Sequence, residues 1–124
     1  LKMAMHCIDS EIAVKVGGVN EAVIFQEFLC QIKDLEYEGL DELHDGEYWI
    51  RTSVKELAEY FTYLTEKQIR TVLEKLRAGG FLKVSNYNED PHDRTLWYTF
   101  GKVGKPIYEE WKKPKCVKVL RSRR

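Results

Sequence analysis

A glycine-rich run near the C-terminus is the first stretch whose residue types suggest chemistry. It reads Gly101-Lys102-Val103-Gly104-Lys105, and glycines beside lysines can form a loop that cradles phosphates. A phosphate loop needs four residues between its glycines and a Ser or Thr after its Lys, whereas this run has two residues and then Pro106. We therefore interpret the run as a turn.

The other polar clusters do not have the spacing of catalytic or metal sites. The acidic run at 89–93 lacks the alternate-position ligands and the central Gly of a calcium loop. No Gly-x-Ser-x-Gly or His-Glu-x-x-His motif is present. The histidines are far apart and follow no metal-ligand pattern; they are His6, His44 and His92. The sequence predicts no catalytic residues, no metal and no cofactor, and so favours a protein that is not an enzyme.

Three side chains have a spacing that suits nucleic-acid binding. Lys67, Arg70 and Thr71 project from the first two turns of a predicted helix, on the side opposite its apolar stripe. A recognition helix places such side chains at base edges and phosphates. The alternative is a solvated helix face, because any amphipathic helix exposes charges and Glu66 and Glu74 would repel a phosphate backbone.

The stretch 53–80 supplies the elements that position these residues. Apolar residues recur there at helical spacing in two successive stripes, namely Val54, Leu57, Ala58 and Phe61, then Ile69, Val72, Leu73 and Leu76. Ser53 with Glu56, and Thr65 with Gln68, predict a capping box at the start of each helix. Gly79 is expected to end the second helix in the left-handed conformation. Two separately capped helices joined by residues 62–64 predict a helix-turn-helix.

A β-hairpin is predicted directly after this pair. Residues 81–85 and 96–100 have strand composition, and the polar segment 86–95 between them forms a long tip. A third strand is predicted at 47–52, running into Ser53. A hairpin in this place is the wing of a winged helix. The predicted fold class is therefore α+β, a winged helix-turn-helix that is mostly helical with a small three-stranded antiparallel sheet.

Two more helices are predicted before the first strand and one after the wing. A short helix with Ile12, Ala13 and Val16 on its apolar face starts at Asp9 or Ser10 and ends at Gly17-Gly18. A long helix follows to about Tyr37, with Asn20 as its N-cap and Val19 packing on Ile24 as a hydrophobic staple. The acidic connector 36–47 has no element of its own, and Pro106 suits the first turn of a helix that ends at Trp111.

These elements predict a single core, with one domain at 1–111 and a basic C-terminal tail at 112–124. The core prediction consists of Phe25, Leu29, Ile32, Leu57, Ile69, Leu73 and Leu76. The tail has little to bury, and its composition is typical of disorder.

Charge is distributed unevenly along the chain although the formal net charge is zero. Residues 1–100 contain 11 Lys and Arg against 18 Asp and Glu, a net charge of −7, whereas 101–124 contain 9 against 2, a net charge of +7. No apolar run approaches the roughly 18 residues that a bilayer crossing requires. The cysteines are unpatterned and indicate neither a disulfide framework nor a zinc site; they are Cys7, Cys30 and Cys116. These features favour a cytoplasmic protein without a membrane partner.

Several short motifs resemble a known family. Three of them are similar to the winged-helix domain of replication-initiator proteins from phages, prophages and plasmids of Gram-positive bacteria. They are Val19-Asn20-Glu21-Ala22, Tyr48-Trp49-Ile50 and Glu66-Lys67-Gln68-Ile69-Arg70. The runs Asn86-Tyr87-Asn88 and Asp93-Arg94-Thr95-Leu96-Trp97-Tyr98 complete the resemblance, which covers about residues 9–100. The family's wing tips tend to be basic, whereas this one carries Glu89, Asp90 and Asp93.

The resemblance implies binding of double-stranded DNA at a replication origin. It also implies a homodimer and replication proteins such as a helicase as partners. The candidate DNA-binding residues are Thr65, Lys67, Gln68, Arg70, Thr71, Lys75, Lys83, Asn86, Asn88, Lys112, Lys113 and Lys115. Arg94 is expected to brace the wing by pairing with Asp90 or Asp93 rather than to contact DNA.

Two alternative functions remain open from the sequence. A transcriptional regulator can have the same fold, because fold does not determine function. A protein-interaction winged helix with an acidic face is favoured by the negative charge of residues 1–100.

Overall fold

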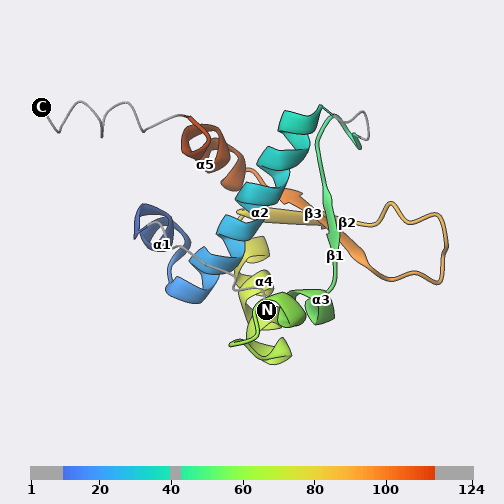
Figure 1. Cartoon of the computed structure of the whole chain (residues 1–124), viewed down its shortest axis with the longest axis horizontal. Helices are drawn as coiled ribbons and strands as arrows, with labels where there is room; N and C mark the ends of the chain where they lie inside the picture. Colours follow the sequence, from blue (N-terminus) through green and yellow to red (C-terminus); the bar gives the residue numbers. More distant parts are fainter. Residues whose placement is uncertain (1–9, 40–42, 114–124) are drawn as a thin grey trace, which may run out of the picture.

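A computed structural model describes residues 10–39 and 43–113 of the chain. Within these residues five helices and three strands follow one another (Figure 1). Their order is α1 (Ser10–Val16), α2 (Val19–Glu38), β1 (Ile50–Thr52), α3 (Val54–Tyr60), α4 (Glu66–Ala78), β2 (Leu82–Ser85), β3 (Leu96–Phe100) and α5 (Gly104–Trp111). The fold is α+β as predicted, and its layout is consistent with a winged helix.

The three strands form one antiparallel sheet with the order β1-β3-β2. β3 lies in the centre, with Tyr98 opposite both Ile50 of β1 and Val84 of β2. The loop between β2 and β3 extends away from the helices, at the right of Figure 1. This projecting hairpin, with its tip at 86–95, is called the wing below.

α2 is the central helix of the fold. It packs on both α1 and α4 and buries Phe25, Phe28, Leu29 and Ile32. Phe25 meets Phe81 and Phe100 in edge contacts, with ring centroids 5.9 and 5.7 Å apart. Every residue of the predicted core is buried in the same cluster. The prediction of one core is therefore confirmed.

α3 and α4 form where the local signals place the two helices of the predicted helix-turn-helix. The Thr65 hydroxyl accepts from the Gln68 backbone amide, and the Gln68 side chain accepts from the Thr65 amide, so the predicted capping box is present. At α3 the Ser53 hydroxyl accepts from the Glu56 amide, but the Glu56 carboxylate bonds to the Ser53 hydroxyl rather than to its backbone amide, so the box predicted there is only half formed. Ile69, Val72, Leu73 and Leu76 are all buried, as the stripe requires. The turn between α3 and α4 thus fixes the direction in which α4 presents its outer face.

The start of α2 differs from the prediction. The helix begins at Val19 with Gly18 as its N-cap, so Asn20 lies inside the helix and caps nothing. Val19 is 58% exposed while Ile24 is fully buried, so the predicted staple is wrong. The Glu21 side chain instead folds back over Gly18, into the space that a Cβ there would occupy.

The end of α4 is one residue later than predicted. Gly79 has φ −81°, and it is Gly80, with φ 79°, that takes the left-handed conformation. The Phe81 amide donates to the Leu76 carbonyl at 2.9 Å and the Gly80 amide to the Arg77 carbonyl at 3.1 Å. These two bonds form a Schellman motif, in which the left-handed residue follows the C-cap.

β1 and β2 are shorter than predicted on their N-terminal sides, whereas β3 has the predicted bounds. β1 starts at Ile50 rather than at residue 47, and β2 starts at Leu82 rather than at 81. The connector contains one isolated antiparallel bridge, between His44 and Glu47, closed by a turn at Asp45-Gly46 in which both residues have positive φ. None of the helices in the described ranges has both the length and the apolar character needed to cross a membrane.

Candidate nucleic-acid interface

The outer face of α4 carries the three side chains that the sequence singled out. Lys67, Arg70 and Thr71 are all exposed. Arg70 lies 3.9 Å from Glu66 in an exposed ion pair, which is a weak interaction in water. The Thr71 hydroxyl donates to the Lys67 backbone carbonyl at 3.0 Å, which leaves its oxygen able to accept. Lys67 forms no ion pair with any described residue, so the two cations remain available to a ligand.

A groove lies between α4 and the wing. It has a volume of about 220 Å³, and its lining residues are Val54, Arg70, Leu73, Glu74, Arg77, Val84, Leu96 and Tyr98. Arg70 and Arg77 stand on the same edge of α4, seven residues or about two turns apart. Arg77 makes no ion pair within the described residues. Arg77 was not among the residues predicted to bind DNA, because only the structure shows that the helix edge which carries it faces the wing.

Two of the predicted DNA-binding residues form the cap of α4. Thr65 and Gln68 hydrogen-bond to each other's backbone, at 3.1 and 2.9 Å. Each side chain uses an acceptor position to fix the first turn of α4, while the Thr65 hydroxyl and the Gln68 amide group remain able to donate.

Two predicted lysines are paired with glutamates elsewhere. The Lys75 ammonium lies 3.3 Å from the buried Glu21 carboxylate, on the edge of α4 that faces α2. The Lys83 ammonium lies 2.7 Å from Glu47 and 5.7 Å from the centre of the Trp49 ring. The structure therefore does not bring Lys75 and Lys83 together with the outer face of α4.

The two predicted wing asparagines serve the loop itself. The Asn86 side chain accepts from the Asn88 backbone amide at 2.9 Å. The Asn88 amide group donates to the carbonyls of Asp93 and Thr95, while its oxygen accepts from Arg51 and Trp97. An Asn side chain has two donors and two acceptor positions. Asn88 therefore has no capacity left for a base or a phosphate.

The expected pairing of Arg94 is wrong. Asp93 forms its ion pair with Arg51 of β1, and it also accepts from the Thr95 backbone amide at 3.0 Å. The hydrogen bonds from Thr95 and the Arg51 guanidinium lower the pKa of Asp93. The Asp90 carboxylate accepts a hydrogen bond from the backbone amide of His92 at 2.9 Å. Arg94 is exposed and makes no ion pair in the described part of the chain.

The first two lysines of the predicted tail belong to the folded structure. The Lys112 ammonium contacts Glu36 at 2.8 Å and Glu109 at 3.1 Å, and it lies over the Tyr108 ring. These carboxylates raise the pKa of Lys112. Lys113 pairs with Glu110 at 3.1 Å. Lys115 and the rest of the predicted tail lie outside the described residues.

An aromatic cluster joins the connector to the base of the wing. His44 is stacked on Tyr87 with ring centroids 4.2 Å apart, and Trp97 and Trp49 meet Tyr87 edge-on. The Tyr87 hydroxyl donates to Asp45. The sequence showed these aromatic residues only as parts of short motifs, because their contacts depend on how strands distant in sequence align.

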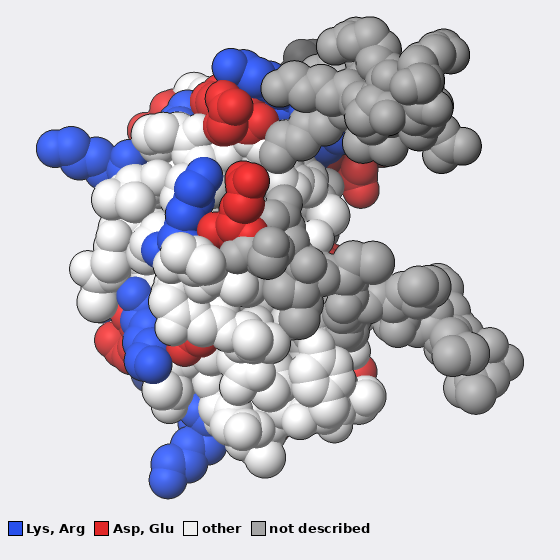
Figure 2. All heavy atoms as spheres, turned by 90° about the vertical axis from the view of Figure 1, so that its left-hand side faces the viewer, with Lys and Arg blue, Asp and Glu red and all other residues white. Residues whose placement is uncertain are grey.

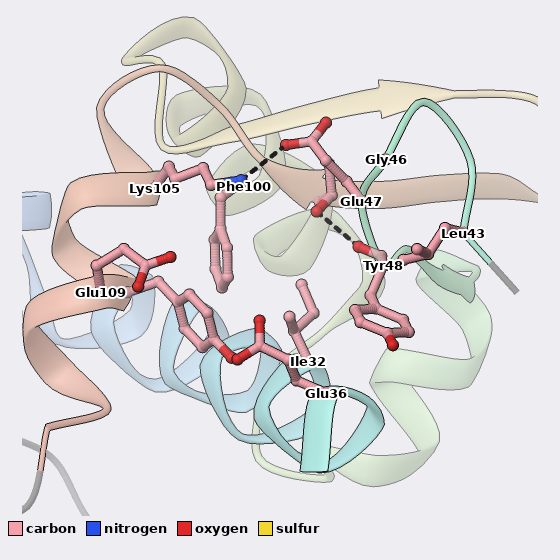
Figure 3. Close-up of a pocket in the computed structure, with 11 residues that line it drawn as sticks. Ile32, Glu36, Leu43, Gly46, Glu47, Tyr48, Phe100, Lys105 and Glu109 are labelled. Atoms are coloured by element: carbon pink, nitrogen blue, oxygen red, sulfur yellow. Dashed lines mark hydrogen bonds and ion pairs between the residues drawn. The ribbon is translucent and has the colours of Figure 1, made fainter. Parts of the chain in front are cut away.

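A second, smaller cavity lies between α2, the connector and α5 (Figure 3). Its volume is about 150 Å³, below the roughly 300 Å³ at which ligand pockets begin. Its carboxylates are already paired: Glu47 with Lys105 at 3.5 Å, and Glu36 with Lys112. Burial and the neighbouring Glu36 raise the pKa of Tyr108 to about 12. Because lysines balance these carboxylates, the described residues that line the cavity show no unpaired charge that would indicate a site for a charged ligand.

The face on which α1 and α5 lie, at the left of Figure 1, has no continuous basic surface where described residues form it. Figure 2 shows its Lys and Arg side chains standing singly, several of them beside Asp or Glu. Among the described residues no three His, Cys, Asp or Glu side chains gather in a way that could hold a metal ion. The arginines beside the groove are thus the better candidate for contact with a polyanion.

No protein-family model, no curated protein and no solved structure matches the chain.

Proposed function

We propose that this chain is a module that binds double-stranded DNA, with α4 as its recognition helix. A helix fits the major groove when one side anchors it and the other presents polar side chains near its N-terminus. α4 is anchored by its buried stripe and its capping box, and it presents Lys67, Arg70 and Thr71 from its first two turns.

The observation that carries the proposal is the placement of Arg70 and Arg77. Both line the groove between α4 and the wing, both are exposed, and their shared helix edge faces the hairpin. Arginine presents a planar fork of donors that suits phosphate oxygens and the acceptor edge of guanine. If Arg70, in the first two turns, reads a base edge, Arg77 lies about two turns farther along, where the DNA backbone passes the helix.

The biological process we propose is initiation of DNA replication. Support comes from the resemblance of the motifs at 19–22, 48–50, 66–70, 86–88 and 93–98 to replication initiators. A homodimer and a helicase are the partners that such a role would involve. A transcriptional regulator would use the same α4 surface, and identifying the DNA sequence it binds would distinguish the two roles.

A second candidate function is a protein-interaction module, and one observation favours it. Of the lysines first assigned to DNA, Lys75, Lys83, Lys112 and Lys113 are each paired with a glutamate. Each of these lysines lies 2.7 to 3.3 Å from its carboxylate, closer than the 3.9 Å between Arg70 and Glu66, so the neighbouring negative charge offsets more of its attraction for phosphates. Among the candidate cations that the structure describes, this leaves Lys67 and Arg70 for DNA affinity.

The test is selection of duplexes from a random-sequence library by the whole chain, followed by affinity measurements at two salt concentrations. DNA binding predicts enrichment of a defined sequence and an affinity that falls steeply as salt rises. No enrichment, together with no binding to mixed duplex at low salt, would refute the proposal and favour a protein partner.

A further inference from the structure

The side chain of Asn88 closes the wing tip, and it uses both its donor and both its acceptor positions in hydrogen bonds. Asn88 donates to the carbonyls of Asp93 and Thr95 at 3.0 and 2.7 Å. Its oxygen accepts from Trp97 Nε1 at 2.7 Å and from Arg51 Nε at 3.1 Å. These bonds tie the start of the loop to its end and to the neighbouring strand β1. A loop of this length would otherwise sample many conformations.

Arg51 and Asp93 complete the closure. The Arg51 guanidinium binds both Asn88 and Asp93, and the Asp93 carboxylate also accepts from the Thr95 amide. Arg51 therefore neutralises the acidic group nearest in sequence to Arg94. This matters because an unpaired carboxylate beside Arg94 would compete with a phosphate for its guanidinium.

Arg94 is the one Lys or Arg of the tip segment 86–95. It is exposed, and it lies two residues before Leu96, which lines the groove beside α4. Asp93 and Thr95 on either side of it are both held by Asn88. The backbone that carries Arg94 is thus fixed from both sides, while its side chain is left for solvent or a ligand.

We propose that Arg94 is the wing's contact with a DNA phosphate, and that Asn88 and Arg51 are positioning residues that hold it there. This inference rests on the proposed function and deepens it. The acidic residues Glu89 and Asp90 at the far end of the loop would repel DNA. The wing then meets the DNA backbone at the end of the loop that leads into β3, near the α4 groove, while Glu89 and Asp90 stay away from the duplex.

The experiment is a double-mutant cycle in DNA affinity. Whole-chain variants Arg94→Ala, Asn88→Ala and the double variant are titrated into a labelled duplex of mixed sequence over a series of salt concentrations. Arg94→Ala should weaken binding about tenfold at low salt and reduce the slope of log affinity against log salt by about 0.9. Asn88→Ala should weaken binding by part of that factor. The double variant should bind no more weakly than Arg94→Ala alone, because Asn88 acts through Arg94.

Two further variants distinguish the loss of a DNA contact from a folding defect. Arg94→Lys keeps the charge at an exposed position and should keep the salt slope. Arg51→Lys keeps a charge on β1 but cannot contact Asn88 and Asp93 with the same planar fork. It should weaken binding in the wild-type background and not in the Arg94→Ala background. Thermal unfolding of each variant reports whether the core is intact.

The outcomes separate this inference from the proposed function. Wild-type affinity in Arg94→Ala, or losses from Asn88→Ala and Arg94→Ala that add fully, would overturn the inference while DNA binding through α4 stands. Failure of the wild-type chain to bind any duplex would overturn both.

Discussion

The guanidinium of Arg51 on β1 forms an ion pair with the carboxylate of Asp93 in the wing, across 42 positions of sequence. The same guanidinium reaches Asn88, so one side chain of the sheet holds two points of the loop. Asp93 therefore pairs with Arg51 and not with the neighbouring Arg94. Arg94 forms no ion pair with any described residue and remains able to bind a ligand.

The first prediction concerns the pH dependence of this contact. The folded-state pKa of Asp93 is lowered from 3.8 by its hydrogen bonds to Thr95 and by Arg51. A carboxylate with a depressed pKa contributes stability above its unfolded pKa and loses that contribution as pH falls through its folded pKa. Asp93→Asn should therefore lower the melting temperature at pH 7, and the difference from wild type should shrink below about pH 4. Circular dichroism melts across this range give the measurement.

Glu89→Gln is the matched control for Asp93→Asn. It removes one negative charge from the same loop at a residue that forms no ion pair with described residues. It should leave the melting temperature near that of wild type at every pH. Equal effects of the two substitutions would show that net charge, and not the contact with Arg51 and Thr95, is responsible.

The second prediction tests the packing of α4. Leu73 is buried to 7% exposure on the stripe that faces the core. Leu73→Ala should reduce the free energy of unfolding by about 2 to 5 kcal/mol, because it removes buried methyl groups and leaves a cavity. Lys67→Ala, on the exposed side of the same helix, should stay within about 0.5 kcal/mol of wild type. Chemical denaturation measures both, and a loss well under 1 kcal/mol for Leu73→Ala would contradict this placement.

The third prediction concerns Gly104, which belongs to the glycine-rich run that was compared with a phosphate loop. A Cβ at Gly104 would overlap the backbone carbonyl of Phe81, so α5 can pack at this distance only with Gly at its first position. Gly104→Ala should therefore destabilise the protein by about 1 to 3 kcal/mol. Gly39→Ala, where a Cβ meets no atom within 4 Å, should cost only the strain of its positive φ. If denaturation shows Gly104→Ala to be the milder of the two, the close approach is not a constraint.

The sequence predicted the parts of this structure that local patterns determine. The stripe of α4 and the Thr65 cap depend on residues within a few positions of each other, and both are present. The approximate positions of the three strands along the chain followed from apolar runs and turns. The start of the long helix was predicted less well: Asn20 is a good N-cap by residue type, but the helix begins at Val19 with Gly18 as its N-cap and has no side-chain cap.

Side-chain pairing was where sequence reasoning failed, because it depends on register and packing. Arg94 was assigned to its neighbours in sequence, whereas Asp93 pairs with Arg51 of another strand. The partner of Lys75 is Glu21, 54 positions away, and that of Lys112 is Glu36, 76 positions away. No periodicity or motif carries such information, and it changed which of the candidate DNA-binding residues are free to act.

The fourth prediction concerns the charges beyond residue 113. Residues 114–124 contain five Lys and Arg and no Asp or Glu. If about four positive charges there neutralise phosphates, deleting 114–124 should reduce the slope of log affinity against log salt by about 3.6. The variant Lys112→Gln/Lys113→Gln should change that slope little, since both lysines are already paired with glutamates. A slope that is unchanged by the deletion would show that the segment contributes nothing to DNA affinity.

The central claim, that the outer face of α4 reads DNA, is tested most directly by Arg70→Ala. Its affinity should be compared with wild type on a duplex selected by the wild-type chain and on a mixed duplex, with Lys15→Ala on the exposed surface of α1 as the equal-charge control. A bidentate contact between Arg70 and a guanine predicts a loss of about 1 to 3 kcal/mol on the selected duplex, a much smaller loss on the mixed duplex, and no selective loss for Lys15→Ala. Wild-type affinity of Arg70→Ala for the selected duplex would contradict the account.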